Sequence, residues 1–144
     1  MYSAADHTRA QEAAAAGPPE ASRRGWAEYL LDIVVGHDRM SSPGAVAAYY
    51  ERILEAARTP SVRAGIQRWN RVIADTVGSA LVQHGIDVPP RVVLALVDGS
   101  VVSWLLDEDQ LDVQTAADRL ADGLDRLGAC PGARGAGRGR HRRH

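Results

Sequence analysis

The stretch Val88–Asp107, VPPRVVLALVDGSVVSWLLD, decides the fold of this chain. Pro89 and Pro90 suit the first turn of a helix, because a residue there needs no N–H for the intrahelical hydrogen bonds. The apolar residues that follow recur at helical spacing, but they cover most of the circumference instead of one stripe. A helix that is apolar on nearly all sides must be covered on nearly all sides. The other segments of one 144-residue protomer are too short to cover this helix on all sides, so the sequence predicts that a partner subunit covers part of it.

The composition is that of one globular domain. An apolar content of 45% over 144 residues is enough for a core, and the absence of Phe leaves the packing to Leu, Val, Ile and three Trp. No run reaches the ~18 apolar residues that a membrane span needs. The N-terminus lacks the apolar core of a signal peptide. The one cysteine, Cys130, has no intrachain disulfide partner, which favours the cytoplasm.

The net charge of −1 is unevenly spread along the chain. Residues 130–144 carry five Arg and no acid, so the other 129 residues hold 12 Arg against 18 acids, a net charge of −6. An acidic body is a poor nucleic-acid surface, and we expect no specific DNA binding by this chain. Residues 129–144 form an Arg/Gly-rich tail that we expect to be disordered. This tail either binds nucleic acid and other polyanions weakly, or it has no function beyond keeping the chain soluble.

Turn residues and apolar periodicity predict five main helices and no strand, so the predicted fold class is all-α. Residues 1–25 are expected to be a weakly ordered lead, in which Ala4–Ala16 has the propensity for a sixth, short helix before Gly17-Pro18-Pro19. The five main helices are predicted at residues 26–34, 43–58, 61–84, 88–107 and 113–127, the last with Asp112 as its N-cap.

The last predicted helix has heptad spacing. Its apolar residues Val113, Ala117, Leu120, Leu124 and Leu127 step by four, three, four and three. This stripe is either a core-facing stripe or one edge of a four-helix bundle. We expect the dimer interface to use Val93, Val97, Val101, Leu120 and Leu124, with the small residues Gly99, Ser100, Ala121 and Gly123 letting the last two helices cross closely.

Two phrases carry a resemblance to a known family. ILEAARTPSVRAGIQRWNRVI (Ile53–Ile73) and ALVDGSVVSWLLDED (Ala95–Asp109), followed by the last amphipathic helix, resemble the C-terminal domain of TetR-family transcriptional regulators. That family ends one helix in an acidic-Ala-x-x-x-Pro phrase, here Glu55–Pro60, and carries Leu-Val-Asp-Gly in its penultimate helix, here Leu96–Gly99. The resemblance covers residues 26–128.

The resemblance implies a bundle of five to six helices, whose last two pair with those of a second subunit as a four-helix bundle. It also implies an effector cavity between the earlier helices. Family members begin with a three-helix DNA-binding module, for which three average helices need roughly 35 residues. Only 25 residues precede Trp26. The chain is therefore either a standalone effector-binding and dimerisation domain or a regulator whose true start lies upstream of Met1.

Candidate ligand-binding residues lie on the second, third and fourth predicted helices. They combine aromatic and apolar side chains with a few polar ones, as a lipophilic ligand requires: Tyr49, Tyr50, Ile53, Trp69, Asn70, Ile73 and Trp104. The alternative is that the aromatic residues are ordinary core in a chain without Phe. Asp98 is unusual in so apolar a helix, and it either pairs with an Arg across the dimer interface or faces water.

No catalytic or metal-binding pattern is found in the sequence. Ser100 follows Gly99 but lacks the second glycine of a nucleophile elbow. There is no HExxH motif and no phosphate-binding glycine loop. We expect no enzyme, no metal and no cofactor.

The leading hypothesis is a TetR-type ligand-binding and dimerisation domain, forming a homodimer and sensing a small hydrophobic molecule in the cytoplasm without binding a membrane. Two alternatives stay open. One is an interaction protein without a pocket, which heterodimerises with a full-length regulator. The other is a DNA-binding repressor truncated at its N-terminus.

Overall fold

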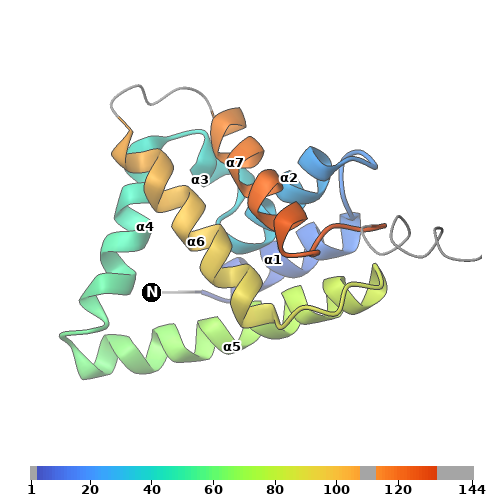
Figure 1. The fold of residues 1–144 in the computed structure, drawn as a ribbon. Helices are drawn as coiled ribbons and strands as arrows, with labels where there is room; N and C mark the ends of the chain where they lie inside the picture. Colours follow the sequence, from blue (N-terminus) through green and yellow to red (C-terminus); the bar gives the residue numbers. More distant parts are fainter. Residues whose placement is uncertain (1–2, 108–112, 133–144) are drawn as a thin grey trace, which may run out of the picture.

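A computed structural model describes residues 3–107 and 113–132 of the chain (Figure 1). Every regular element in these residues is helical, which confirms the predicted all-α class. The helices are α1 (Ala4–Ala16), α2 (Arg23–Val34), α3 (His37–Met40), α4 (Pro43–Glu55), α5 (Pro60–Gln83), α6 (Pro90–Leu106) and α7 (Val113–Arg126). Across both described ranges, no helix combines the length and hydrophobicity needed to cross a membrane.

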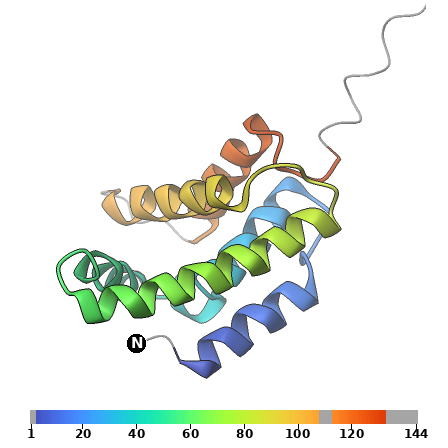
Figure 2. The ribbon, with the colours of Figure 1, turned by 90° about the horizontal axis from the view of Figure 1, so that it is seen from below.

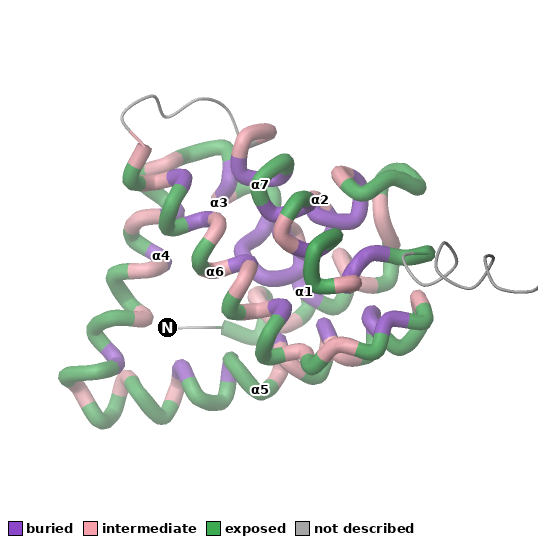
Figure 3. Tube along the Cα trace, viewed as in Figure 1, coloured by how far each residue is buried: buried purple, intermediate pink, exposed green. Residues whose placement is uncertain are grey.

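Helix α2 is the centre of the bundle. It contacts α1, α5, α6 and α7, and eight of its twelve residues are buried. Figure 3 shows this buried segment in the middle of the molecule, with mostly exposed residues along α4 and the first half of α5. In Figure 2, α6 and α7 form one outer layer and α1 lies on the opposite side of α5. The core therefore lies between these two outer layers, around α2.

Helix α1 differs from the predicted weakly ordered lead. Ser3 and Asp6 form a capping box at its start, and Ala10 is completely buried. The Tyr29 hydroxyl on α2 donates to the Ala14 carbonyl oxygen at 2.6 Å. Apolar periodicity gives no sign of this packing, because α1 is rich in Ala and contacts α2 and α5 through small side chains and hydrogen bonds.

Two arginines join α1 and α3 to the C-terminal end of α2. Arg9 Nη1 and Nη2 donate to the carbonyl oxygens of Asp32 and Ile33 at 2.5 and 3.3 Å. Arg39 donates to the Val35 carbonyl oxygen at 3.1 Å and to the Asp6 carboxylate at 2.6 Å. The last carbonyls of a helix lack intrahelical donors and carry partial negative charge, so these cations stabilise the end of α2.

The boundaries of the main helices are close to the predicted ones. Helix α4 begins at Pro43, with the Ser42 hydroxyl accepting from Ala45 N–H, but it ends at Glu55, three residues earlier than predicted. The Arg63 side chain donates to the carbonyl oxygens of Ala56 and Ala57 and so stabilises a turn there. The segment predicted as a loop after α2 contains the short helix α3. The predicted N-cap Asp112 lies outside the described residues, as does the predicted disordered tail of residues 129–144 from residue 133 on. At the start of that tail, Ala129 and Cys130 are described and are buried.

Candidate effector-binding and dimerisation sites

Aromatic side chains from α1, α4 and α5 meet in one cluster. Trp69 Nε1–H donates to the Tyr49 hydroxyl at 3.5 Å, and that hydroxyl donates to the Val34 carbonyl oxygen at 3.4 Å. The His7 ring stacks on Trp69 with 5.4 Å between ring centroids, and Tyr50 meets Tyr49 edge-on at 5.0 Å. The structure thus brings together three of the predicted ligand-binding residues and adds His7, which the sequence did not single out.

Asp98 on α6 accepts a hydrogen bond from the Tyr50 hydroxyl at 2.8 Å. Burial raises the pKa of this carboxyl above its ordinary value, and the hydrogen bond from Tyr50 works in the opposite direction. The described contact of Asp98 is therefore with a tyrosine of the same chain, and its pairing with an arginine across a dimer interface stays a prediction. The two residues are 48 positions apart, so no local pattern could reveal the pair.

The other predicted ligand-binding residues fall into two groups. Ile73 and Trp104 are buried and Ile53 is half-buried, whereas Asn70 is exposed to solvent. Asn70 lies on the outer side of α5, because the buried face of that helix is already taken by Trp69, Ile73 and Val77. It is therefore not an inward-facing polar group. Ligand binding by this residue set stays a prediction.

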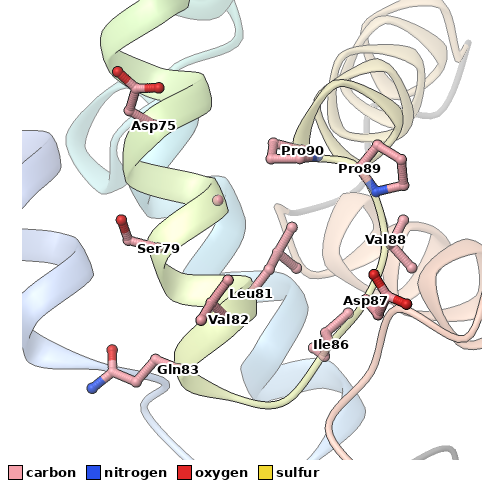
Figure 4. A pocket seen from close by; sticks show the side chains of 11 residues that line it. Asp75, Ser79, Leu81, Val82, Gln83, Ile86, Asp87, Val88, Pro89 and Pro90 are labelled. Carbon is pink, nitrogen blue, oxygen red and sulfur yellow. The ribbon is translucent and has the colours of Figure 1, made fainter.

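A groove runs between the end of α5 and the segment that leads into α6. Figure 4 shows Ile86 and Pro90 on the side of this segment that faces α5, with the polar side chains of Asp75, Ser79 and Gln83 along the far side of α5. The groove measures about 850 Å³ and opens widely to solvent. At its upper end a Cβ on Gly78 would lie 3.0 Å from Pro90 Cγ, so the two segments approach closely there.

A second, more enclosed hollow lies between α1, α2, α3 and α7, and we name it the amphipathic cavity. It measures about 580 Å³, and its lining includes Pro18, Glu28, Leu31, Asp32, Met40 and Ala117. A volume of this size is typical of small-molecule sites. The predicted cluster of Tyr49, Tyr50 and Trp69 does not line either of these two hollows.

Helix α6 has two apolar faces. Val93, Val97 and Val101 are completely buried within the chain, as are Leu120 and Leu124 on α7. The sequence pattern predicts these five residues as dimer anchors. Within one chain they pack into its own core, and their place at a dimer interface stays a prediction. The predicted close crossing of α6 and α7 does occur at Gly123, where an added Cβ would lie 3.0 Å from Leu96.

The opposite face of α6 remains exposed and apolar. Val92, Val102 and Leu106 are 41%, 38% and 79% exposed, and Leu127 at the end of α7 is 46% exposed. Gly99 lies among them at mid-helix with nothing within 4 Å of an added Cβ. We call this surface the outer face: Val92, Ala95, Leu96, Gly99, Val102, Ser103 and Leu106 of α6, with Gly123 and Leu127 of α7.

Residues 21–129 match the family described as Tetracyclin repressor-like, C-terminal domain. The chain belongs to this family. The matched residues span α2 to α7, which we call the TetR-like domain. Helix α1 lies N-terminal to the first matched residue. No curated protein and no solved structure matches the chain. The family assigns this domain to transcription regulation and confirms the predicted resemblance.

Both phrases behind the resemblance have a structural place in the TetR-like domain. Glu55–Pro60 forms the turn between α4 and α5, where Thr59 Oγ1 donates to Glu55 Oε1 at 2.6 Å. Leu96–Gly99 lies in the middle of α6: Leu96 packs against Gly123 of α7, and Asp98 bonds Tyr50 of α4. The second phrase therefore links α6 to both of these helices.

Proposed function

We propose that this chain is the ligand-binding and dimerisation domain of a TetR-type transcriptional regulator and that it forms a homodimer through the outer face. The observation that carries this proposal is the second apolar face of α6, exposed over its whole length opposite a fully buried one. A contiguous exposed apolar surface of this kind is typical of a protein interface. Charged residues at its edge, including the ion pair of Arg119 with Asp107, suit the polar rim of an interface.

Cysteine cross-linking tests this interface directly. In a two-fold dimer, a residue near the axis lies close to its own copy. We expect one or more of Ala95→Cys, Gly99→Cys and Val102→Cys, made in a Cys130→Ala background, to form an intersubunit disulfide on mild oxidation. Val82→Cys on α5 is the matched control, because Val82 is 79% exposed but lies away from the outer face. Equal cross-linking at Val82 and at the three α6 positions would overturn the proposal.

We further propose that the domain senses a small hydrophobic molecule in the cytoplasm and performs no catalysis. The family supports a regulatory domain, and the aromatic cluster supports an optical test. Trp69 is 1% exposed and stacked on His7, so a ligand entering near α4 and α5 would change its fluorescence. A Trp69→Tyr variant separates its signal from those of Trp26 and Trp104. No change in emission with any hydrophobic compound that binds the chain would exclude the aromatic cluster as the sensor.

One observation favours the second candidate, an interaction protein without a pocket at the aromatic cluster. Tyr49, Trp69 and His7 contact one another directly, so their side chains occupy the space that the sequence assigned to a ligand. Mixing the chain with a full-length TetR regulator and measuring subunit exchange by native mass spectrometry distinguishes the two. Mixed dimers support heterodimerisation, and exclusive self-pairing supports the homodimeric sensor.

DNA binding by the described helices is not part of this proposal. Arg9 and Ala10 of α1 are engaged with α2 and the core, so residues 3–16 belong to the helical bundle. We expect fluorescence anisotropy with duplex DNA to show only weak binding that salt abolishes. Tight, sequence-dependent binding would contradict this expectation.

A further inference from the structure

The amphipathic cavity is built from the three consecutive helices α1, α2 and α3 and from the distant helix α7. Its walls come from the end of α1 and the following Gly17-Pro18-Pro19, from one face of α2, from α3 and from the start of α7. Helices α2 and α7 pack against each other, and Figure 1 shows α3 near them, next to the start of α4. A molecule in this cavity would touch both α2, the central helix, and α7, the helix that borders the outer face.

The floor of the cavity is apolar. Leu31 and Met40 are each 4% exposed, and Ala117 is 2% exposed. The Tyr29 ring also reaches the lining, with its hydroxyl donating to the Ala14 carbonyl oxygen. Met and Tyr are polarizable side chains that favour apolar and cationic ligand groups. The floor therefore suits the hydrocarbon part of a small molecule.

Two carboxylates line the same cavity. Glu28 and Asp32 are four residues apart on α2 and so share one face of that helix. No arginine is found among the described lining residues. His37 also contributes to the lining, and its backbone N–H donates to Asp32 Oδ1 at 2.8 Å. The charged groups of this cavity therefore favour a positive ligand over a negative one.

The nearest cations do not neutralise both carboxylates. Arg24 lies 3.3 Å from Glu28 but is shared with Asp118 at 3.6 Å. Arg9 directs its donors to the main-chain carbonyl oxygens of Asp32 and Ile33, and it acts on the Asp32 carboxylate through its charge, without a hydrogen bond. The second oxygen of Asp32 and part of the Glu28 carboxylate therefore remain as acceptors.

We propose that the amphipathic cavity binds a small organic cation, with its apolar part on Leu31, Met40 and Ala117 and its positive charge against Glu28 and Asp32. This inference rests on the sensing function proposed above and deepens it by naming the ligand class and a location different from the aromatic cluster. A cation bound in this cavity would contact α2 and α7 at the same time.

Calorimetry on the full chain tests the ligand class with three probes of similar size. The probes are benzyltrimethylammonium, its neutral isostere neopentylbenzene and the anion benzenesulfonate. We expect the cation to bind at least about tenfold more tightly than the neutral probe, which corresponds to about 1.4 kcal/mol, and the anion not to bind. Added salt should weaken the binding of the cation and leave the binding of the neutral probe unchanged. Equal binding of the cation and the neutral probe, or tighter binding of the anion, would overturn the charge assignment.

Conservative variants test the location. Glu28→Gln and Asp32→Asn should each weaken binding of benzyltrimethylammonium about tenfold, because each removes one negative charge at constant size. Asp122→Asn, on the exposed side of α7, is the control and should leave the affinity unchanged. Wild-type affinity in both Glu28→Gln and Asp32→Asn would refute the role of these carboxylates.

Filling the cavity provides an independent test. Ala13→Leu and Ala16→Trp, both in the lining, should abolish binding of the cation. Thermal unfolding identifies any variant that fails to fold, and Ala16 is exposed at the rim, so that substitution disturbs no core. Undiminished binding in a folded Ala16→Trp chain would exclude the cavity. Loss of the cation site leaves the dimer proposal intact, whereas cation binding by a monomeric chain contradicts the dimer proposal alone.

Discussion

Asp98 is the one carboxylate on a helix that is otherwise apolar along both of its faces. Its partner is the Tyr50 hydroxyl, which ties the middle of α6 to α4. A half-buried carboxylate loses part of its hydration in the charged form, and this loss raises the pKa of Asp98. The residue therefore reduces the stability of the domain at neutral pH.

We predict that Asp98→Asn stabilises the domain in a pH-dependent way. The folded chain holds the Asp98 proton more tightly than the unfolded chain, whose pKa is near the ordinary 3.8. The stability of the wild type therefore falls as pH rises from 3.8 through the raised pKa, and the asparagine variant lacks this loss. Urea unfolding from about pH 4 to about pH 8 measures the difference. A constant gap between the two proteins at all pH values would contradict the account.

At the scale of elements, α1 depends on hydrogen bonds to the end of α2 more than on apolar area. Arg9 is half-buried, and its Nε has no hydrogen-bond partner, while both Nη atoms bind carbonyl oxygens. Burial, followed by the nearby charge of Arg39, lowers the pKa of Arg9. These contacts explain why a helix with little amphipathic pattern is part of the bundle.

We predict that Arg9→Met detaches α1 without unfolding α2 to α7. Each lost hydrogen bond of a charged group contributes ~1.5–3 kcal/mol, and methionine keeps most of the side-chain length. Hydrogen exchange should become fast in residues 4–16 and stay slow in α2. Arg68→Met, at an exposed position on α5, is the matched control. Unchanged protection of α1 in Arg9→Met would show that apolar packing alone holds this helix.

The junction between α1 and α2 depends on Gly25. An added Cβ there would lie 2.3 Å from the Glu20 carbonyl oxygen, a backbone atom that cannot rotate away. We predict that Gly25→Ala destabilises the domain by ~1–3 kcal/mol, as overpacked sites do. Gly65→Ala on α5 has its nearest neighbour at 3.9 Å and should instead stabilise the domain by up to ~1 kcal/mol through helix propensity. Thermal unfolding of both variants measures whether each substitution raises or lowers the stability. A stabilising effect of Gly25→Ala would contradict the geometry.

At the scale of the whole molecule, the sequence predicted the helices and the surplus apolar surface of α6, but it assigned the dimer interface to the face of α6 that is buried within the chain. Helical periodicity groups Val93, Val97 and Val101 together, and it groups Val92, Gly99 and Val102 equally well. The packing of α2, α5 and α7 against α6 decides which group is buried. The Tyr50–Asp98 pair and the amphipathic cavity were also beyond prediction, since both depend on residues brought together by the tertiary fold.

Substitution of a buried anchor should therefore unfold the chain and not dissociate it. Leu120 is completely buried, so Leu120→Asp places a charge in the core. We predict the loss of cooperative thermal unfolding in this variant, measured by circular dichroism. A folded, monomeric Leu120→Asp protein would instead restore Leu120 as an interface residue.

The molar mass in solution, measured by sedimentation equilibrium, tests the outer-face dimer most directly. We predict twice the mass of the chain for the wild type and for Val82→Asp, and the mass of one chain for a folded Val102→Asp. Both substitutions place aspartate at an exposed valine, and only Val102 lies on the outer face. A wild type with the mass of a single chain at all concentrations, or an undiminished dimer in Val102→Asp, would contradict the account.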